Sequence, residues 1–316
     1  MIDTEAYEAY ESRFESRADR RSKARVSKPK PQPESAIAEL SDPSDTADFG
    51  FHPSYKSSHH DHGEMQWIID ALSGFYDDRL INDVLRAVKG GKEASVYCCS
   101  AHPATGVALI AGKIYRPRMF RSLKNDALYR EGRGMLDGEG KTIKARDKRI
   151  QRAVHNMTRF GHELRIGSWI GHEYETLRLL HAAGADVPQP HALGNNAILM
   201  AYLGDEDSAA PTLNDVALDR GEAQPLFECV MRNIELMLLN HRIHADLSAY
   251  NILYWNGAIT LIDFPQAVDP RSNPHARSLL ARDVERVCQY FQRYGVKADP
   301  FALTRGLWSR YMRGDF

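Results

Sequence analysis

HADLSAYNILYWNGAITLIDF, residues 244–264, joins a polar loop to two short apolar runs. The runs flank an Asn-Gly pair at 256–257, which is a strong hairpin signal because both residues tolerate the positive φ of a tight turn. Asp246 and Asn251 lie in the loop before the hairpin, and Asp263 follows its second strand. The loop can therefore present Asp246 and Asn251 to one cleft, and the hairpin brings Asp263 beside them.

These three side chains suit phosphoryl transfer from a nucleotide. The reaction needs a carboxylate that positions or deprotonates the acceptor, and oxygen ligands for the magnesium ion that bridges the phosphates. Asp246 can meet the first need, and Asn251 and Asp263 can meet the second. Each residue also has an ordinary structural use, because Asp and Asn satisfy turns and strand ends. Their order and spacing together favour the phosphoryl-transfer site.

A glycine-containing stretch upstream is a candidate phosphate loop. GGKEASVY, residues 90–97, lies between two predicted strands, so its backbone N–H groups could lie over a triphosphate. The valine on the second strand could face an adenine ring. A diglycine between strands is, on its own, more often a plain turn. The candidate nucleotide contacts in this stretch are Gly90, Gly91, Lys92, Glu93, Ala94, Ser95 and Val96.

Lys113 stands in the otherwise apolar run AGKIY, where burying an unpaired ammonium group would be costly. Glu173, on a predicted helix, could hold this lysine so that its ammonium reaches the α- and β-phosphates. An exposed edge lysine and a surface glutamate are the plainer alternatives. The loop around Asp246 favours the paired arrangement.

The first half of the chain predicts a five-stranded antiparallel sheet with one helix. The apolar positions from Ile81 on, then GGKEASVYCCS and GVALIAGKIY, predict three strands. WIGHEYETLRLLHAA, residues 169–183, predicts a helix with Ser168 as its N-cap and Gly184 after its end. HALG and AILMAYLG, on either side of a turn at 195–196, predict two further strands.

Beyond Gly204 the sequence predicts a mainly helical lobe. Pro225 and Pro274 each suit the first turn of a helix, and Gly295 ends the second of these helices. A last helix is expected over residues 300–313. The whole pattern predicts an α+β chain with a sheet-containing lobe followed by a helical one.

Residues 1–62 differ from the rest of the chain. A basic stretch, RRSKARVSKPKPQP, precedes Ser, Asp and Pro residues, and large apolar residues are few. Such a segment cannot offset its ordering entropy, so a disordered tail is predicted. The His-rich group at 59–62 invites a metal-site interpretation, but a second ligand pair at structural spacing is missing. A solvated tail is the favoured interpretation.

The composition limits the class of protein. The chain has 316 residues, 43% of them apolar, which is enough for a substantial core. Its 41 basic and 42 acidic residues give a net charge of −1, so any affinity for nucleic acid needs a local patch. Its four cysteines form no CxxC pair, and no apolar run approaches the roughly 18 residues that span a bilayer. A cytoplasmic protein without a membrane partner is expected.

Local charge is concentrated in residues 116–165. This stretch contains fourteen Lys or Arg and six Asp or Glu, and the difference is +8. A basic stretch of this density could neutralise several phosphates of RNA. A solvated, flexible loop that keeps the protein soluble explains the same charge equally well.

Several motifs together resemble the RIO family of atypical serine/threonine protein kinases. They are GGKEASVY, AGKIY, the WIGHEYETL helix, VPQP, LMAYLG, HADLSAYNILY, LIDFPQ and PHARSLLARDVERV, and they cover roughly residues 80–295 in family order. The resemblance implies a two-lobed protein-kinase-like fold with ATP in the cleft. It also implies a reduced C-lobe without the usual activation loop. Residues 1–62 are then the tail, 63–203 the N-lobe with its basic flexible loop, and 204–316 the C-lobe.

The resemblance also implies roles for single residues. Asp246 looks like the catalytic aspartate, with Asp263 beside it in the reaction. The implied metal ligands are Asn251 and Asp263. The implied nucleotide contacts outside residues 90–96 are the phosphate-pairing Lys113 with its helix partner Glu173, the gatekeeper Met200, and the hinge from Ala201 to Leu203.

The sequence departs from ordinary protein kinases at two motifs. Ala245 stands where those kinases place an arginine that receives an activation-loop phosphate, so switching by loop phosphorylation is not expected. Asp263-Phe264-Pro265 replaces the common DFG, and the proline should stiffen this loop. In the RIO family the aspartate at the position of Asp263 is implicated in forming a phosphoaspartate. A switch-type ATPase is therefore a version of the same hypothesis.

The sequence thus predicts a RIO-like serine/threonine kinase or ATPase that uses ATP and Mg²⁺, with Mn²⁺ as an alternative metal. A small-molecule phosphotransferase of the aminoglycoside or choline kinase type is a second hypothesis, although such enzymes usually carry glycine at the position of Ala245. A nucleotide-gated RNA-binding assembly factor is a third. The expected partners are a protein acceptor and, by analogy, ribosomal RNA or a ribosomal subunit that contacts the basic loop 116–165.

Overall fold

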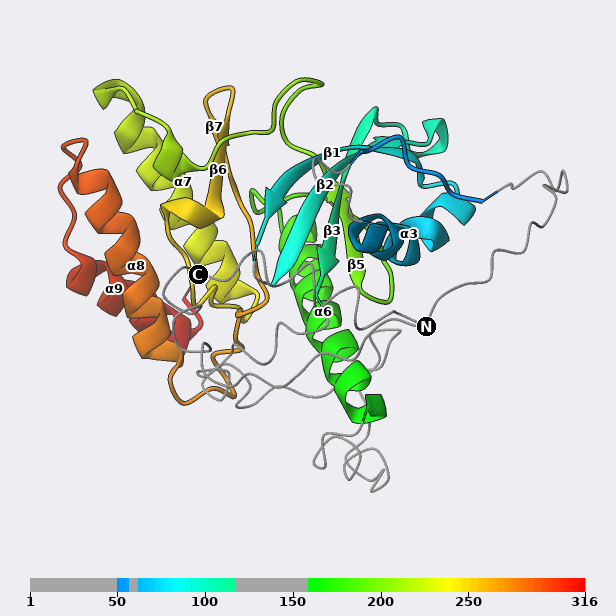
Figure 1. Ribbon diagram of the computed structural model, residues 1–316. Helices are drawn as coiled ribbons and strands as arrows, with labels where there is room; N and C mark the ends of the chain where they lie inside the picture. The colour runs from blue at the N-terminus through cyan, green and yellow to red at the C-terminus, as the bar shows by residue number, and fades with distance from the viewer. Residues whose placement is uncertain (1–49, 57–61, 92, 117–158, 316) are drawn as a thin grey trace, which may run out of the picture.

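A five-stranded antiparallel sheet forms the first lobe of the molecule (Figure 1). The structure is a computed structural model that describes residues 50–56, 62–91, 93–116 and 159–315. The strands follow the spatial order β1-β2-β3-β5-β4. Their bounds are β1 Ile81–Gly90, β2 Ala94–Ala101, β3 Leu109–Tyr115, β4 Pro190–Leu193 and β5 Ala197–Ala201. All five strands agree with the sequence prediction.

The long helix α6, Arg159–Ala182, packs against strands β4 and β5. It ends where the sequence predicts, before Gly184, whose φ is +77°. It begins earlier than predicted, so Ser168 is not an N-cap but a buried residue inside the helix. Serine costs only about half a kilocalorie in a helix interior, so a single serine did not have to mark a boundary.

A second helix in this lobe, α3 at His62–Asp77, was not predicted. Its side chains Trp67, Ile68, Leu72 and Phe75 are buried in one cluster with residues of β1, β2 and β3. Ile68, Leu72 and Phe75 are four and three residues apart, and this spacing of apolar residues indicates a helix in the sequence. The described part of the first lobe therefore has two helices, where the sequence predicted one.

Residues 50–56, expected to be disordered, pack on the sheet instead. Phe51 is buried, and its ring centroid lies 4.9 Å from that of Tyr76. The N–H of Tyr55 donates to the carbonyl of Val84 at 3.0 Å, which extends the edge of the sheet at β1. Two aromatic side chains offset the cost of ordering this short segment, so the disorder prediction was wrong here.

Other sequence predictions lie outside the described residues. These are the rest of the predicted tail at 1–49 and 57–61, which includes most of the His-rich group, and residues 117–158 of the predicted basic loop. The proposed RNA contact through that loop therefore stays a prediction. Among the described residues, no helix is long and apolar enough to cross a membrane.

The second lobe is mainly helical and includes the hairpin that the sequence predicts. Its helices are α7 Arg220–Leu239, α8 Ala276–Gln292 and α9 Pro300–Arg313, with short 3-10 turns η4 Leu213–Asp215 and η5 Ala249–Asn251. The hairpin strands are β6 Ile252–Trp255 and β7 Ala258–Leu261. The turn residues Asn256 and Gly257 have φ values of 50° and 80°, as a turn with two positive φ angles requires.

Helix α7 begins before the predicted proline. Asp219 is its N-cap, and the carboxylate of Glu222 accepts a hydrogen bond from the Asp219 N–H at 3.3 Å. Pro225 therefore lies inside the helix rather than in its first position. The capping pair fixes the start of α7, and Pro225, six residues after the cap, removes one N–H donor from the hydrogen-bond ladder of the helix.

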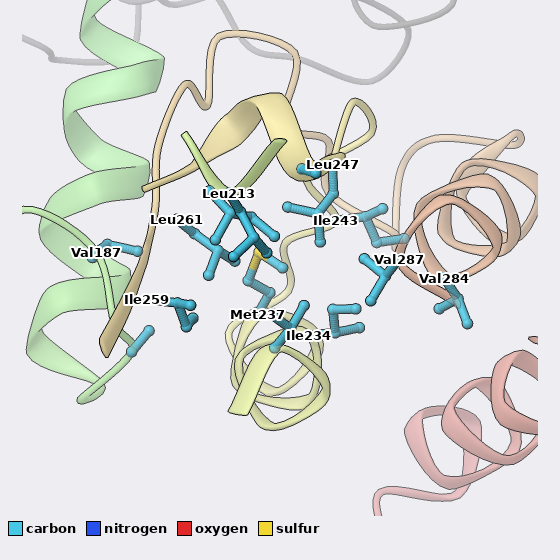
Figure 2. Close-up of a cluster of buried hydrophobic side chains, with 14 of the residues drawn as sticks. Val187, Leu213, Ile234, Met237, Ile243, Leu247, Ile259, Leu261, Val284 and Val287 are labelled. Atoms are coloured by element: carbon cyan, nitrogen blue, oxygen red, sulfur yellow. The ribbon is translucent and has the colours of Figure 1, made fainter. Parts of the chain in front are cut away.

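The core of the second lobe anchors the loop that the sequence singled out. Figure 2 shows Ile234 and Met237 of α7 between Ile259 of β7 on one side and Val287 of α8 on the other, and all four belong to one buried cluster. The same buried cluster contains residues on both sides of the polar loop, namely Ile243 and Leu247. The ends of the loop at 244–246 are thus fixed by apolar packing.

Candidate active site

A cavity of about 780 Å³ lies between the two lobes. Strands β1, β2, β3 and β5 line one side, and the loops around residues 246–253 and 262–266 line the other. This volume is typical of a site for a small molecule or cofactor. The cavity brings Lys113 together with Asp246, Asn251 and Asp263.

Lys113 joins the two lobes through its ammonium group. Its Nζ lies 2.7 Å from Oε1 of Glu173 on α6 and 2.7 Å from Oδ1 of Asp263 on the loop after β7. Lys113 and Glu173 are buried, whereas 42% of the Asp263 side chain is exposed. The Tyr115 hydroxyl donates a hydrogen bond to the second carboxylate oxygen of Glu173. The lysine that the sequence predicted to need an anion has two.

The charges of this network set its protonation. Burial alone would lower the pKa of Lys113, but the carboxylates of Asp263 and Glu173 outweigh burial and raise it above its ordinary value. Burial raises the pKa of Glu173, although Lys113 opposes that shift. Burial would also raise the pKa of Asp263, but the ammonium of Lys113 lowers it below its usual range. Lys113 is therefore charged, and Asp263 is ionised beside it.

The loop that carries Asp246 is held through its backbone. Asp283 of α8 is buried, and its two carboxylate oxygens accept hydrogen bonds from the N–H groups of Ala245 at 2.7 Å and Leu247 at 3.0 Å. Ala245 has a φ of 67°, a left-handed conformation that costs an alanine roughly 1–2 kcal/mol. Burial raises the pKa of Asp283 to about 7, although both backbone N–H groups oppose the shift.

His244 is a neutral structural residue of the same loop. Its ring is buried against Phe264, with ring centroids 4.8 Å apart, and burial lowers its pKa. Nε2 lies 3.1 Å from the carbonyl of Ile262, and Nδ1 accepts from the Asp246 N–H at 3.4 Å. Because a carbonyl can only accept, the proton is on Nε2. The imidazole thereby links the loop of Asp246 to the loop of Asp263.

Asn251 and Asp263 supply oxygen atoms suited to a divalent cation. The Asn251 side chain is nearly buried, and its Nδ2 donates to the Asp246 carbonyl at 3.0 Å, which leaves its amide oxygen as the possible ligand. Asp263 uses Oδ1 for Lys113. Mg²⁺ prefers such hard oxygen donors and usually takes one or two protein ligands together with substrate phosphates and water. The donor set therefore fits a metal ion that arrives with a nucleotide.

The predicted phosphate loop is a tight turn that contributes only some of its residues to the cavity. Gly91, Glu93, Ala94 and Val96 line it. The N–H of Gly91 donates within the turn to the carbonyl of Ala94 at 2.9 Å. The Ala94 carbonyl lies so close to Gly91 that a Cβ at this position would be only 3.0 Å from its oxygen, which explains the glycine.

Two other predicted loop contacts, Gly90 and Ser95, lie elsewhere. Gly90 belongs to β1 and pairs with Ser95 of β2, and neither lines the cavity. The hydroxyl of Ser95 is buried and accepts a hydrogen bond from Arg116 at 3.1 Å. Alternation along β2 explains this placement, because neighbouring side chains point to opposite faces. Lys92 lies outside the described residues.

Glu93 has an electrostatic role that the sequence did not suggest. Burial raises its pKa to about 7, and the carboxylate of Asp263 adds to the shift, whereas Lys113 opposes it. A glutamate in this position carries a proton for part of the time near neutral pH. It lines the cavity beside the predicted phosphate site.

The predicted gatekeeper and hinge also line the cavity. Met200, Ala201 and Leu203 belong to or follow β5. The N–H of Ala201 donates to the carbonyl of Gln189 at 2.7 Å, and the carbonyl of Leu203 accepts from the N–H of Ala210 at 2.9 Å. These two backbone groups are therefore already used within the protein.

Three apolar residues that the sequence prediction missed line the cavity together with Val96. Ala111 of β3 and Val96 of β2 line it from the first lobe, and Leu253 of β6 and Ile262 line it from the second. Of these four, only Val96 was singled out in the sequence. The alternation along AGKIY, which puts Ala111 on the same face as Lys113, was the available signal.

The sheet with its crossing helix α6, the helical second lobe and the polar residues at their junction define a protein-kinase-like fold. Residues 138–303 match the model of the RIO domain. The chain belongs to the RIO family.

Relatives in this family are serine/threonine-protein kinases. RIO-type serine/threonine-protein kinase Rio1 of Thermoplasma acidophilum is 36% identical over 132 residues, which cover 42% of this chain and 68% of the relative. Serine/threonine-protein kinase rio1 of Schizosaccharomyces pombe is 29% identical, over 67% of this chain and 39% of its own. Serine/threonine-protein kinase RIO1 of Homo sapiens is 28% identical over a region that covers 69% of this chain and 34% of the relative. These similarities support a RIO-like kinase function, which implies the use of ATP and a divalent metal ion.

Solved structures add a weaker likeness. The Cydia pomonella granulovirus kinase PK-1 aligns with a TM-score of 0.33 and 13% identity, over 58% of this chain and 54% of its own. A likeness at this level carries no inference about function.

Proposed function

We propose that this protein transfers the γ-phosphoryl group of ATP to a serine or threonine hydroxyl, with Mg²⁺ as its metal and Mn²⁺ as a substitute. The observation that carries the proposal is the 2.7 Å contact between Lys113 and Asp263 in a cavity that Asp246 and Asn251 also line. In such a transfer, catalysis consists of positioning and charge stabilisation, and these four side chains are of the right chemical types.

Each side chain has one task in this proposal. Lys113, oriented by Glu173, binds phosphate oxygens of the nucleotide. Asn251 and Asp263 hold the metal ion, which neutralises the charge that develops on the phosphates when it is bound. Asp246 orients the acceptor hydroxyl and accepts its proton, a contribution worth about 10²- to 10⁴-fold.

The backbone groups of the hinge at residues 201–203 indicate how adenine would bind. Because the Ala201 N–H and the Leu203 carbonyl are engaged, we propose that adenine contacts the Ala201 carbonyl and the Leu203 N–H instead. The apolar residues Val96, Ala111 and Leu253 would cover the two faces of the ring. The backbone N–H groups of the turn at 91–94 would face the phosphates.

A switch-type ATPase is the second form of the same function. Asp263 is ionised and 42% exposed, so its free carboxylate oxygen is accessible to a phosphoryl group. Phe264, buried against His244, resists any rotation of this loop, which favours a fixed aspartate over a flipping one. A cytoplasmic location is also part of the proposal, supported by the free thiols of all four cysteines.

Radiolabelled ATP turnover by the purified chain tests this function. Asp246→Ala should abolish turnover, while ATP still binds through Lys113 and the hinge. Hydroxylamine treatment of any labelled protein separates the two forms, because an acyl phosphate on Asp263 is released and a phosphoserine persists. Normal turnover by the Asp246→Ala variant would refute the assignment.

The aminoglycoside- or choline-type alternative is tested by the same assay. Small alcohols and protein acceptors are offered side by side at equal concentration. Transfer to the alcohols alone would move the function to that class.

A further inference from the structure

Helix α8 presents three charged side chains to the loop that carries Asp246. Arg282 donates a hydrogen bond to the carbonyl of Ala245, and Asp283 accepts from two backbone N–H groups of the loop. Arg286, one turn further along, reaches the side chain instead, and its Nη1 lies 2.8 Å from Oδ1 of Asp246. Of these three side chains, two hold the backbone of the loop and one touches the proposed catalytic carboxylate.

Exposure separates the contact of Arg286 from the contacts of Asp283. Asp283 is buried, whereas the side chains of Arg286 and Asp246 are 38% and 40% exposed. An ion pair this open to solvent adds little to folding stability. Arg286 can therefore be replaced without unfolding the lobe, and its contact with Asp246 needs an explanation other than stability.

The position of Arg286 shows on which side of Asp246 its guanidinium group lies. Among the described residues, Asp246 lines the cavity proposed for the nucleotide, and Arg286 does not. The guanidinium thus approaches the carboxylate from outside the nucleotide cavity. In the proposed function the nucleotide occupies the cavity, so an acceptor hydroxyl would reach Asp246 from the side on which Arg286 lies.

The chemistry of a guanidinium suggests what it meets there. Arginine has five N–H donors in one plane, which match the two oxygens of a carboxylate or phosphate. The contact with Asp246 uses one terminal nitrogen. Arg282 lies four residues earlier on the same helix and adds positive charge to this face. Neighbours of the acceptor hydroxyl would meet a positively charged surface.

We infer that Arg286 is a specificity-determining residue that selects a protein acceptor whose serine or threonine is flanked by an acidic side chain. The inference rests on the proposed role of Asp246 in orienting the acceptor. Arg286 holds Asp246 through one nitrogen and binds the flanking carboxylate with its other donors. Losing the charge should weaken the binding of acidic acceptors and leave the nucleotide site intact.

Matched serine peptides test this inference. They carry Glu, Gln or Lys at the positions beside the acceptor, and kcat/KM is measured at constant ATP. The unchanged protein should prefer the Glu peptide over the Gln peptide by about tenfold or more, as a charge-assisted contact would give. Arg286→Gln should remove the preference through the KM for peptide, with the KM for ATP unchanged. Arg286→Glu should prefer the Lys peptide.

Arg277→Gln is the matched control, because it removes the same charge from an exposed position on the same helix. It should keep the acidic preference. Equal urea midpoints of the two variants show that both are folded. Retention of the acidic preference by Arg286→Gln, or the absence of any preference in the unchanged protein, would overturn the inference.

Two further outcomes separate this inference from the proposed function. If the protein turns over ATP but phosphorylates no peptide, the acceptor inference falls and phosphoryl transfer stands. If Asp246→Ala keeps full turnover, the role of Asp246 falls, and the inference with it. A peptide with phosphoserine beside the acceptor can be compared with the Glu peptide. If the protein prefers the phosphoserine peptide and shows no preference for the Glu peptide, the anion that Arg286 recognises is a phosphate and not a carboxylate, and the inference is overturned.

Discussion

The two lobes hold their halves of the site in different ways. In the first lobe, side-chain charges hold Lys113, with Glu173 and Asp263 each 2.7 Å from its ammonium. In the second lobe, Asp246 is held through the backbone of its loop, which Asp283 fixes with two hydrogen bonds. The position of Lys113 therefore depends on the balance of positive and negative charge around it, whereas the position of Asp246 depends on the hydrogen bonds that hold its loop. Substitutions that change one and keep the other should therefore act differently in the two lobes.

The largest effect is expected for Lys113→Met, which removes the charge at the centre of the network. Turnover of ATP should fall by at least about 10³-fold, since preorganised charge is the main catalytic contribution here. The free energy of unfolding should also fall by about 3–5 kcal/mol, because Glu173 is left buried and uncompensated. Radiolabelled turnover and urea unfolding measure the two effects.

The double variant Lys113→Met with Glu173→Gln separates stability from activity. It removes the uncompensated buried charge, and glutamine can still accept from the Tyr115 hydroxyl. Part of the lost stability should return, while turnover stays low. A single Lys113→Met variant as stable and active as the unchanged protein would contradict the charge-balance explanation.

A smaller effect on turnover is expected for Asp283→Ala in the second lobe. The substitution leaves the N–H groups of Ala245 and Leu247 without their acceptor, which should cost about 2–6 kcal/mol of unfolding free energy. Turnover should fall by about 10- to 100-fold because Asp246 loses its fixed position. Asp283→Asn keeps one acceptor oxygen, so its losses of stability and turnover should lie between those of Asp283→Ala and the unchanged protein. Urea unfolding and initial rates measure both.

Glu285→Gln is the control for this prediction. Glu285 is exposed on the same helix, two residues along, and accepts from Gln289 at 3.1 Å. Its replacement should change neither stability nor turnover by a measurable amount. Equal losses in Asp283→Ala and Glu285→Gln would show that helix charge, and not the loop hydrogen bonds, is responsible.

The same contrast explains what the sequence could predict. Asp246, Asn251 and Asp263 lie within one short stretch around an Asn-Gly hairpin, so local rules bring them together. Lys113 was recognised because a lysine in an apolar run needs an anion. The motif PHARSLLARDVERV contains Asp283 and Arg286, but the sequence did not give them a role, since their contacts join residues 36 to 40 positions apart.

Element boundaries and packed segments show the same limit. The strands have alternating or turn-bounded patterns, and all five were predicted. Ser168 and Pro225 both resemble helix starts, but each lies inside a longer helix because tertiary packing and the Asp219 cap decide the boundary. Helix α3 was missed although its apolar spacing was present.

The pH dependence of stability offers a finer comparison of the lobes, because the pKa is raised to about 7 for Glu93 in the first lobe and for Asp283 in the second. Each folded pKa lies above the ordinary value, so the native state binds the proton more tightly than the unfolded state. The stability from these groups should be largest at low pH, fall as pH rises toward 7, and level off above it.

Glu93→Gln should flatten this dependence without removing it. The variant loses the contribution of Glu93 between pH 4.5, its ordinary pKa, and about 7, while the contribution of Asp283 remains. Urea midpoints of both proteins across pH 4.5 to 8 give the slopes. An unchanged or steeper slope in the variant would show that burial does not shift the Glu93 carboxyl in the expected direction.

The smallest effects concern one glycine in each lobe. Gly257, in the hairpin of the second lobe, has a φ of +80°, and a Cβ there would meet nothing within 4 Å. Gly257→Ala should therefore cost about 1–2 kcal/mol of unfolding free energy from conformation alone. Turnover should not change, because the core and Asp283 fix Asp246 independently of the hairpin tip.

Gly91→Ala in the first lobe should give the opposite pattern. The residue has no positive φ, so conformation costs little, but the new Cβ would press on the Ala94 carbonyl at 3.0 Å in the turn that lines the cavity. We expect a small change in stability and a severalfold rise in the KM for ATP. If Gly257→Ala raised that KM more than Gly91→Ala did, nucleotide binding would depend on the hairpin, and the division of tasks between the lobes would be wrong.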